Sequence, residues 1–352
     1  MDATRGLDPP DTRAGGPHGT QKAVAVTNRR TLRTRALAPL AALAILTLAA
    51  CGGGGDAFEE AESESAAAGG DLGEITVGGA DFTEMAIMEN MYALLLEQAG
   101  FTVDIKVAQQ REIYAQSLIS GEMDVVPDYA ATMAEYFNTQ ANGPEAPLVS
   151  TSDAQETVAA LAALVEPEGL AVLEPSEAAD QNGFYVTQAF AEENSLTTLS
   201  DLAALGQPIT LAANDECDLP ERQYCAPGLR SVYGLNIVTP MTGDDFASAT
   251  GKQKVVDGEA QLGLTGTTDG TLEGLGLVIL EDDKALQAAD NFVPVVNAES
   301  AGGAEVADAL NPLSAVLTTE DITALNFRVD GQRELPEDVA RDYLVEKGLL
   351  EE

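Results

Sequence analysis

The sequence predicts an α/β protein of two lobes, each a sheet flanked by helices, with a cleft between the lobes and two hinge crossovers. Two observations lead to this prediction. Segments with strand and helix patterns alternate from residue 74 onward, which is typical of a sheet covered by helices. After a second such series, an extended segment at 292–296 and a helical C-terminus at 303–350 suggest that the chain returns to its first unit. With 45% apolar and 22% charged residues, the 352-residue chain can bury the core that this fold requires.

The first series runs from residue 74 to residue 129. β-branched and apolar residues predict strands, and a 3.6-residue apolar period predicts helices: strands at 74–80 (EITVGGA), 102–108 (TVDIKVA) and 123–129 (MDVVPDY), helices at 83–98 and 112–120. Thr83, with Asp81 before it, suits a helix N-cap, and Gly100 suits the position after a helix end. Alternating strands and helices predict a parallel sheet with helices on both faces.

The remaining elements define the second lobe and the crossovers. A helix at 153–165 and a strand at 170–173 close the first part, and a second series runs from residue 183 to a strand at 275–280. Crossovers are expected near residues 180 and 288, which makes lobe I residues 73–180 plus 289–352 and lobe II residues 181–288. Ligands of such sheets bind beyond the carboxyl ends of the strands, so the cleft is the expected site.

The charge of the chain excludes several functions. Lys and Arg number 18 against 58 Asp and Glu, a net charge of −40. Such a surface repels phosphate backbones, so no nucleic-acid partner is expected. The one histidine, His18, lies in a segment that we expect to be removed. Catalysis by Ser-His-Asp or Cys-His groups, and metal sites with His ligands, are therefore not expected in the mature chain.

The first 50 residues have the pattern of a secretory signal. Seven Lys or Arg residues precede an apolar run at 36–50, which is too short to span a bilayer as a stable helix. Small residues just before Cys51 resemble a bacterial lipobox, in which the cysteine is lipidated and becomes the new N-terminus. Residues 1–50 are thus expected to be a lipoprotein signal peptide. Cleavage at an Ala-x-Ala site, with Cys51 incidental, is the alternative.

Residues 51–72 are predicted to be the lipidated cysteine and a flexible acidic tether. The segment is rich in Gly and acidic residues, and it has neither bases nor a periodic apolar face. Further along, Cys217 and Cys225 are eight residues apart, and outside the cytoplasm such a pair is expected to form a disulfide. A free pair is the alternative, and the spacing does not suit a metal or redox CxxC site.

Several segments together resemble a known family: GGADFTEMAIMENMYALLLEQAGF, SGEMDVVPDYAATMAEYF, CAPGLRSVYGL, GLTGTTDG, LVILEDDK and DNFVPVVNAE. They resemble the substrate-binding proteins of ABC importers for glycine betaine, choline and carnitine, in order and spacing, over about residues 74–350. The resemblance implies a type II periplasmic-binding-protein-like fold that closes on its solute and delivers it to a membrane permease. It implies no cofactor.

Proteins of this family hold a quaternary ammonium in a cage of aromatic rings, because a methylated cation offers no hydrogen-bond donor. The resemblance places Tyr129 of VPDYAAT at the first cage tyrosine and Thr132 at a polar contact. In QNGFYVT, either Phe184 or Tyr185 takes the second ring position, since strand alternation lets only one of them face the cleft. A core tyrosine is the alternative for Tyr129.

Other positions depart from the family pattern. The third and fourth cage tyrosines correspond to Gly266 and Asp290, and Met85 replaces a glutamine that often helps to hold the ligand. Losing two rings is expected to weaken the binding of plain glycine betaine by about five-fold to a thousand-fold. Asp290 can compensate by attracting a cation in a dry cleft, which favours a cationic or zwitterionic amine. A solvated hinge residue is the alternative for Asp290.

Two arginines are candidates for binding a carboxylate on the ligand. Arg111 stands where the family has a Gly-Gly-Thr turn, at a helix N-terminus, and Arg222 lies in the ERQYC loop. Either arginine can instead neutralise acidic neighbours. Asp269 of GLTGTTDG completes the candidate ligand-binding residues.

The sequence thus predicts an extracytoplasmic solute-binding lipoprotein, anchored to the outer face of a bacterial cell membrane. Its expected partners are a small solute and the ABC permease and ATPase subunits. The alternatives are a ligand-sensing lipoprotein with the same fold, or a binder of a different amine or amino-acid-like solute such as ergothioneine. An enzyme is not expected, because the mature chain has no P-loop, GxSxG motif or metal-ligand spacing.

Overall fold

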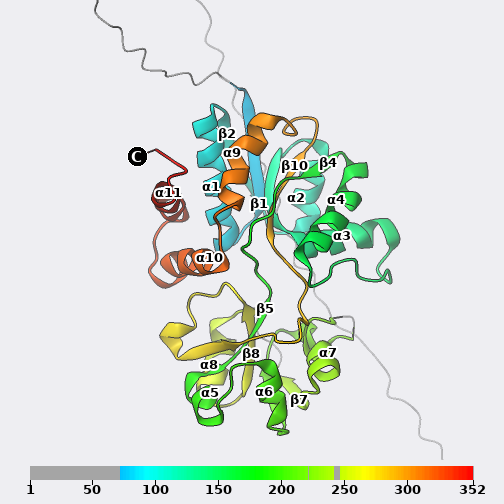
Figure 1. The fold of residues 1–352 in the computed structure, drawn as a ribbon, viewed down its shortest axis with the longest axis vertical. Coiled ribbons are helices and arrows are strands. Elements are labelled where there is room, and N and C mark those ends of the chain that lie inside the picture. Colours follow the sequence, from blue (N-terminus) through cyan, green and yellow to red (C-terminus); the bar gives the residue numbers. More distant parts are fainter. Residues whose placement is uncertain (1–71, 221, 242–245, 352) are drawn as a thin grey trace, which may run out of the picture. The chain divides into compact units, whose positions relative to one another are not determined.

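The structure, a computed structural model, describes residues 72–220, 222–241 and 246–351, and two mixed sheets organise them (Figure 1). All of these residues fall within one unit by their contacts. The predicted signal peptide, Cys51 and, apart from Leu72, the tether lie outside the described residues. None of the helices in the described segments combines the length and the apolar character that crossing a bilayer requires.

The first sheet has five strands in the spatial order β2-β1-β3-β10-β4. Its strands are β1 (Glu74–Ala80), β2 (Thr102–Ala108), β3 (Val125–Tyr129), β4 (Leu170–Val172) and β10 (Phe292–Asn297). Its helices are α1 (Thr83–Ala99), α2 (Arg111–Ser120), α3 (Ala130–Asn142), α4 (Ala154–Val165), α9 (Ala304–Ser314), α10 (Thr319–Asn326) and α11 (Pro336–Glu346). All of these segments lie where the sequence patterns predict them, except α3, which follows directly from β3.

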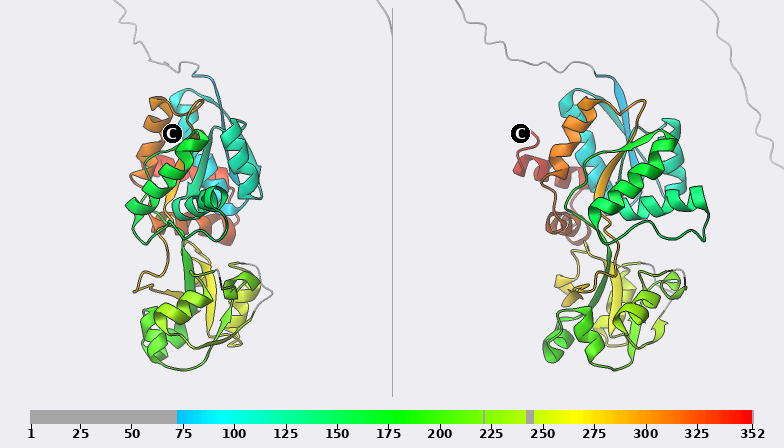
Figure 2. Two further views of the ribbon diagram at one scale, coloured as in Figure 1. Left: turned by 90° about the vertical axis from the view of Figure 1, so that its right-hand side faces the viewer. Right: turned by 45° about the vertical axis from the view of Figure 1, so that its right-hand side comes forward.

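Helices cover both faces of this sheet, and the strands supply side chains to each face in turn (Figure 2). Val125 packs into the core under α1, α9, α10 and α11, and Val126 packs into the core under α2, α3 and α4. In β10, Val293 and Val295 face the second of these cores, and Phe292 faces the first. The period of two along a strand explains this alternation.

The second sheet also has five strands, in the order β7-β6-β8-β5-β9. Its strands are β5 (Asn182–Thr187), β6 (Ile209–Ala212), β7 (Ile237–Met241), β8 (Leu262–Gly266) and β9 (Leu277–Leu280). Its helices are α5 (Gln188–Asn194), α6 (Leu199–Ala204), α7 (Ala226–Gly228) and α8 (Ala249–Val256).

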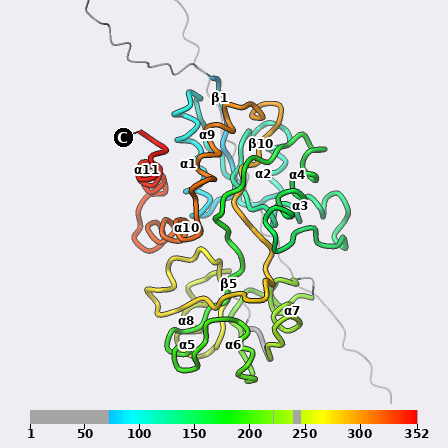
Figure 3. Tube along the Cα trace, viewed as in Figure 1, coloured from blue at the N-terminus to red at the C-terminus, as the bar shows by residue number. Residues whose placement is uncertain are grey.

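Two segments cross between the sheets, one ahead of β5 and one ahead of β10 (Figure 3). They lie side by side, because Ala179 and Asn291 form an isolated antiparallel bridge. The predicted two-lobed fold with two crossovers is confirmed. The lobe boundaries at 180/181 and 288/289 stay a prediction.

The parallel arrangement predicted for the first series is confirmed for its three strands, but each complete sheet is mixed. Strands β1, β2 and β3 are parallel to one another, as are β6, β7 and β8, but β10 is antiparallel to β3 and β5 is antiparallel to β8. The crossovers explain the reversal. In the first sheet, β3 ends at the edge that faces the crossovers, whereas β10 begins at that edge and therefore runs antiparallel to β3. In the second sheet, β5 likewise begins at the crossover edge and runs antiparallel to β8.

The ends of α1 show one correct and one wrong prediction. Gly100 follows the helix in the left-handed conformation, with φ of 109°, which favours glycine. The N-cap is Phe82 rather than Thr83, and no side chain caps the helix. Thr83 instead donates its hydroxyl to Asp330, 2.7 Å away, so a tertiary contact replaces the local cap.

Candidate functional site

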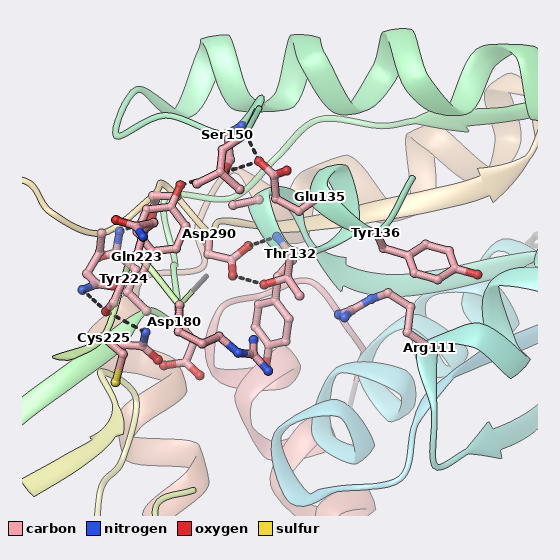
Figure 4. Close-up of a pocket in the computed structure, with 18 of the residues that line it drawn as sticks. Arg111, Thr132, Glu135, Tyr136, Ser150, Asp180, Gln223, Tyr224, Cys225 and Asp290 are labelled. Carbon is pink, nitrogen blue, oxygen red and sulfur yellow. Dashed lines mark hydrogen bonds between the residues drawn. The ribbon is translucent and has the colours of Figure 1, made fainter. Parts of the chain in front are cut away.

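A cavity of about 610 Å³ lies where the carboxyl end of β3 meets the crossover segments (Figure 4). Tyr129 and Thr132 line it from the first sheet's side, and Asn182 and Tyr224 line it from the second. Asp290, in the crossover ahead of β10, completes this part of the wall. The cavity lies at the strand ends, where binding was expected.

Tyr129 is the last residue of β3 and the N-cap of α3, so its side chain leaves the sheet at the edge that faces the cavity. The side chain is half-buried, and its ring packs against Phe292 with the ring centroids 4.9 Å apart. Its hydroxyl donates a hydrogen bond to Glu84. The residue also borders a second cavity, of about 950 Å³. Tyr129 is therefore accessible from two cavities rather than enclosed in the core.

Asp290 and Thr132 form a pair on the wall of the first cavity. The backbone N–H of Thr132 donates to Asp290 Oδ1 at 2.9 Å, and its hydroxyl donates to Oδ2. Burial raises the pKa of Asp290 to about 6, against the opposing effect of these two hydrogen bonds. At neutral pH the cavity wall therefore carries a largely ionised carboxylate.

Asp180 is a second carboxylate at the site, which the sequence analysis missed. It borders both cavities, and a Cβ atom built on Gly266 would lie only 2.7 Å from its Oδ1. The Asp180 carboxylate thus occupies the space beside the position at which the resemblance implies a cage tyrosine. Burial, followed by the nearby charge of Glu84, raises the pKa of Asp180 to about 7.

Glu84, in the first turn of α1, is a third carboxylate and was also missed. It is 4% exposed, and its two oxygens accept hydrogen bonds from Tyr129 and from Asn326 Nδ2. Burial raises its pKa. No local pattern distinguishes Glu84 or Asp180 from the many other acidic residues, because only the tertiary structure brings them to Tyr129.

Arg111 is the first residue of α2 and lines the first cavity, as predicted for a helix N-terminus. Its guanidinium binds Asp128 through two hydrogen bonds, of 2.8 Å from Nη2 and 3.2 Å from Nε. Tyr114 also donates to Asp128, at 2.8 Å. The charge of Arg111 is therefore balanced within its own lobe.

Arg222 lines the same cavity and forms an ion pair with Glu216. The structure thus brings both predicted arginines to one cavity, but each binds a carboxylate of the protein. This arrangement matches the alternative in which they neutralise acidic neighbours.

Three predicted ligand-binding residues lie away from both cavities. Phe184 and Tyr185 are each 1% exposed, in the cores on opposite faces of the second sheet. The ring of Tyr185 covers Gly263, since a Cβ atom there would lie 2.1 Å from Tyr185 Cζ. Met85 is 2% exposed, in the core under α1. The prediction assumed that one face of β5 borders the cleft, but both faces of this strand are covered.

Asp269 lines the second cavity and forms an ion pair with Lys252, 2.5 Å away. Thr265 and Thr271 also donate hydrogen bonds to its carboxylate. The structure therefore places six of the nine predicted ligand-binding residues on the two cavities, five on the first and Asp269 on the second. Their roles in binding stay predictions.

Three aromatic residues on the cavity walls were missed: Tyr136, Tyr224 and Phe246. The hydroxyl of Tyr224 lies 3.1 Å from Ser150 Oγ, and its backbone carbonyl accepts hydrogen bonds from Asn182 and Gln287. The sequence did contain a signal for Tyr224, because this residue lies one position before Cys225, in the short loop that the disulfide closes. Rings therefore line the first cavity at positions other than those the resemblance implied.

Cys217 and Cys225 form a disulfide, with their Cα atoms 5.2 Å apart. Changing both cysteines to Ser is expected to lower the free energy of unfolding by about 2.5 kcal/mol, because the unfolded chain regains the entropy of the opened loop. Urea unfolding of the double variant and of the oxidised wild type measures this difference. Equal stability of the two proteins would contradict the prediction.

Two lobes built on mixed sheets, joined by two crossovers, give this chain the fold of the type II periplasmic binding proteins. The model of one family, described as the substrate binding domain of ABC-type glycine betaine transport systems, matches residues 73–346. The chain belongs to this family. The resemblance stated from the sequence segments is thereby confirmed.

Characterised relatives agree with this assignment. The chain is 26% identical over 298 residues to the glycine-betaine-binding protein of Pseudomonas aeruginosa, covering 79% of this chain and 89% of that one. It is 27% identical over 283 residues to the glycine betaine-binding protein YehZ of Escherichia coli, covering 78% and 90%. The structure of apo YehZ matches with a TM-score of 0.66 over 78% of this chain and 99% of YehZ.

Proposed function

We propose that this protein captures a small cation of the quaternary ammonium class in its cleft and delivers it to an ABC permease. The observation that carries this proposal is the position of Tyr129, whose side chain lies among the carboxylates of Glu84, Asp180 and Asp290. A methylated ammonium binds to aromatic ring faces and to opposite charge, because it has no hydrogen-bond donor. One ring with three acidic neighbours provides both kinds of contact.

The charge balance of the site favours a cation over a zwitterion. Arg111 and Arg222, the two arginines on the first cavity's wall, each form an ion pair with a carboxylate of the protein. A carboxylate on the ligand would have to displace one of these pairs. A buried cation, by contrast, gains from every unneutralised carboxylate in a medium of low dielectric constant.

Family membership supports the remaining parts of the proposal. Proteins of this family are substrate-binding components of transport systems rather than enzymes, and substrate-binding proteins of ABC importers are extracytoplasmic. For this chain we add an ATPase that acts with the permease, and a lipid anchor at Cys51 on the outer face of the membrane. The acidic segment 51–72 would then let the anchored protein reach the permease.

Isothermal titration against a panel of solutes tests the proposal. The panel contains choline, glycine betaine, carnitine, ergothioneine and basic amino acids. We expect the tightest binding from a quaternary ammonium without a carboxylate. If none of these quaternary ammonium compounds produces heat or a shift in melting temperature, the proposed function is wrong.

Binding of the cation is expected to weaken at low pH. The pKa of Asp290 is about 6 and that of Asp180 about 7, so both carboxylates take up protons between pH 8 and pH 5, and a cation then loses its counter-charges. We expect the affinity at pH 5 to be about ten-fold lower than the affinity at pH 8. Asp290→Asn should reduce this pH dependence. Titrations at both pH values measure it.

Asp104→Asn is the control for this experiment. Asp104 is an exposed carboxylate on β2 and lines neither cavity. The Asp104→Asn variant should bind the cation with an affinity within about two-fold of the wild type, because solvent and salt screen a distant surface charge. Identical affinities of the wild type at pH 5 and pH 8 would show that neither carboxylate contacts the ligand.

A further inference from the structure

The loop that follows β8 in the second lobe contacts α10 of the first lobe. A Cβ atom built on Gly270 in this loop would lie 2.4 Å from the backbone carbonyl oxygen of Thr323 and 2.7 Å from Phe327 Cβ. Thr323 belongs to α10, and Phe327 follows that helix directly. Since Cβ atoms in proteins essentially never lie within 3.0 Å of such atoms, the lobes approach this closely only because residue 270 is a glycine.

Space, rather than backbone conformation, requires a glycine at this position. Gly270 is not among the glycines with positive φ, so alanine would need no left-handed conformation here. The three atoms nearest to the built Cβ all belong to Thr323 and Phe327, on the other lobe. Gly270 therefore serves the contact between the lobes and not the turn in which it lies.

Asp269 anchors this loop to its own lobe. Its carboxylate forms an ion pair with Lys252, 2.5 Å away, and both side chains are only 9% exposed. The hydroxyl groups of Thr265 and Thr271 also donate to Asp269, at 2.5 Å and 2.6 Å. Breaking a buried ion pair is strongly destabilising, because it leaves a charge without its partner. The loop therefore cannot easily move away from α10.

Helix α10 is held equally firmly in the first lobe. Ile322 and Leu325 are 0% and 4% exposed in the core under α1, and Thr318 and Asp321 form a capping box at the start of the helix. The atoms that a side chain at position 270 would meet are two backbone atoms and a Cβ, which rotation of a side chain cannot remove. A larger residue at this position must therefore push the lobes apart.

The contact lies beside the carboxylates that surround Tyr129. Asn326, the last residue of α10, donates through Nδ2 to Glu84 Oε2 at 2.6 Å and to the backbone carbonyl of Thr268 at 3.1 Å. The backbone N–H of Thr268 donates to Asp180 Oδ1 at 3.3 Å. The helix and the loop thus bind Glu84 and Asp180 respectively, so separating the lobes here would move these two carboxylates apart.

We propose that Gly270 sets how closely the two lobes approach beside Tyr129, and that it is thereby a positioning residue for solute binding. It lines neither cavity, so it acts through the groups on either side of it. Another contact between the lobes, from Tyr224 to Ser150, joins two hydroxyl groups on rotatable side chains and can adjust. Only the effect on affinity rests on the proposed function, since the separation of the lobes can be measured without a solute.

Gly270→Ala and Gly270→Val test the proposal with side chains of two sizes. We expect Gly270→Ala to bind the tightest solute of the panel about ten-fold more weakly than the wild type, and Gly270→Val more weakly still. Most of the loss should appear as faster dissociation, because changes at a contact alter dissociation more than association. Isothermal titration measures the affinity, and stopped-flow displacement of the solute measures the dissociation rate.

Spin labels measure the separation of the lobes without a solute. Glu193→Cys on α5 and Glu337→Cys on α11 place labels at exposed positions in different lobes, outside both cavities. Cys51→Ser leaves the two disulfide-bonded cysteines as the only others in the chain. Electron–electron double resonance should give a longer mean distance in Gly270→Ala than in the wild type, and the longest in Gly270→Val.

Gly303→Ala is the control for both measurements. Gly303 precedes α9 and lines neither cavity, and a Cβ atom there would meet only the end of the flexible Glu305 side chain. This variant should have the wild-type distance between the labels and an affinity within about two-fold of the wild type.

Two results would overturn the proposal. Wild-type distances in both Gly270 variants would mean that the loop absorbs the added group, even if the melting temperature falls. Longer distances with wild-type affinity and dissociation rate would mean that the separation does not position the solute. If Gly270→Val does not fold, Gly270→Ala decides. If no solute binds, the proposed function and the effect on affinity are both wrong, while the distances still decide whether Gly270 sets the separation.

Discussion

Replacing Tyr129 with Leu is expected to weaken binding of a quaternary ammonium cation by about 30-fold. The ring lies at the boundary of two cavities and among three carboxylates, where a cation loses most of its water. A cation over an aromatic ring in such a desolvated site gains about 2 kcal/mol, which corresponds to the stated factor. Leu retains much of the apolar volume but has no ring face. Isothermal titration with the tightest ligand of the panel measures the loss.

Tyr129→Phe is the matched control for this experiment. It keeps the ring and removes the hydroxyl, which donates to Glu84. Binding should stay within about five-fold of the wild type, because the ring face is retained. The melting temperature should fall, since the buried Glu84 carboxylate loses one of its donors. A Leu variant that binds as tightly as the Phe variant would mean that the ring does not hold the cation.

The second prediction concerns stability. Glu89 of α1 is 1% exposed, its Oε1 has no hydrogen-bond partner, and burial followed by the charge of Asp81 raises its pKa to about 8. The folded state therefore retains a proton that the unfolded state releases near its ordinary pKa of 4.5. The stability contributed by this proton is complete below pH 4.5 and is lost as the pH rises through about 8. Between these values Glu89 lowers the free energy of unfolding by about 1.4 kcal/mol per pH unit.

Glu89→Gln should remove this loss, because an amide cannot ionise. The variant is expected to gain stability over the wild type as the pH rises from 5 to 8, by about 4 kcal/mol at the upper end. Urea unfolding of both proteins at pH 5, 6, 7 and 8 measures the difference. Glu97→Gln, on an exposed position of the same helix, is the control. A difference between Glu89→Gln and the wild type that is the same at all four pH values would contradict the prediction.

Much of the fold could be predicted from local patterns. The apolar runs of β1, β3 and β10 and the apolar period of α1 identify these elements, because burial against a neighbouring layer requires such patterns. Gly100 was identified as a helix end because few other residues adopt its backbone conformation. The direction of β10 was not predictable in this way, since a strand pattern is the same whichever way the strand runs.

The residues of the candidate site were likewise predictable only in part. Tyr129, Thr132 and Asp290 follow strand ends or a crossover, so their positions in the chain already place them near the cleft. Phe184 and Tyr185 were predicted from one strand in isolation, and the helices on both faces of the second sheet bury them. The partners of Arg111 and Arg222 were not predictable, because many acidic residues compete for few bases.

By itself, the amino-acid sequence determined the α/β class, the two-lobed family and the tyrosine at the end of β3, because each depends on a local pattern or on an ordered set of segments. Only the tertiary structure decided which acidic residues surround that tyrosine. Glu84 comes from α1 and Asp180 from a crossover, and Asn326, with its unpaired carbonyl oxygen, ends α10. These residues are distant in the chain, and their pairing depends on burial and on the relative placement of elements, which no local pattern records.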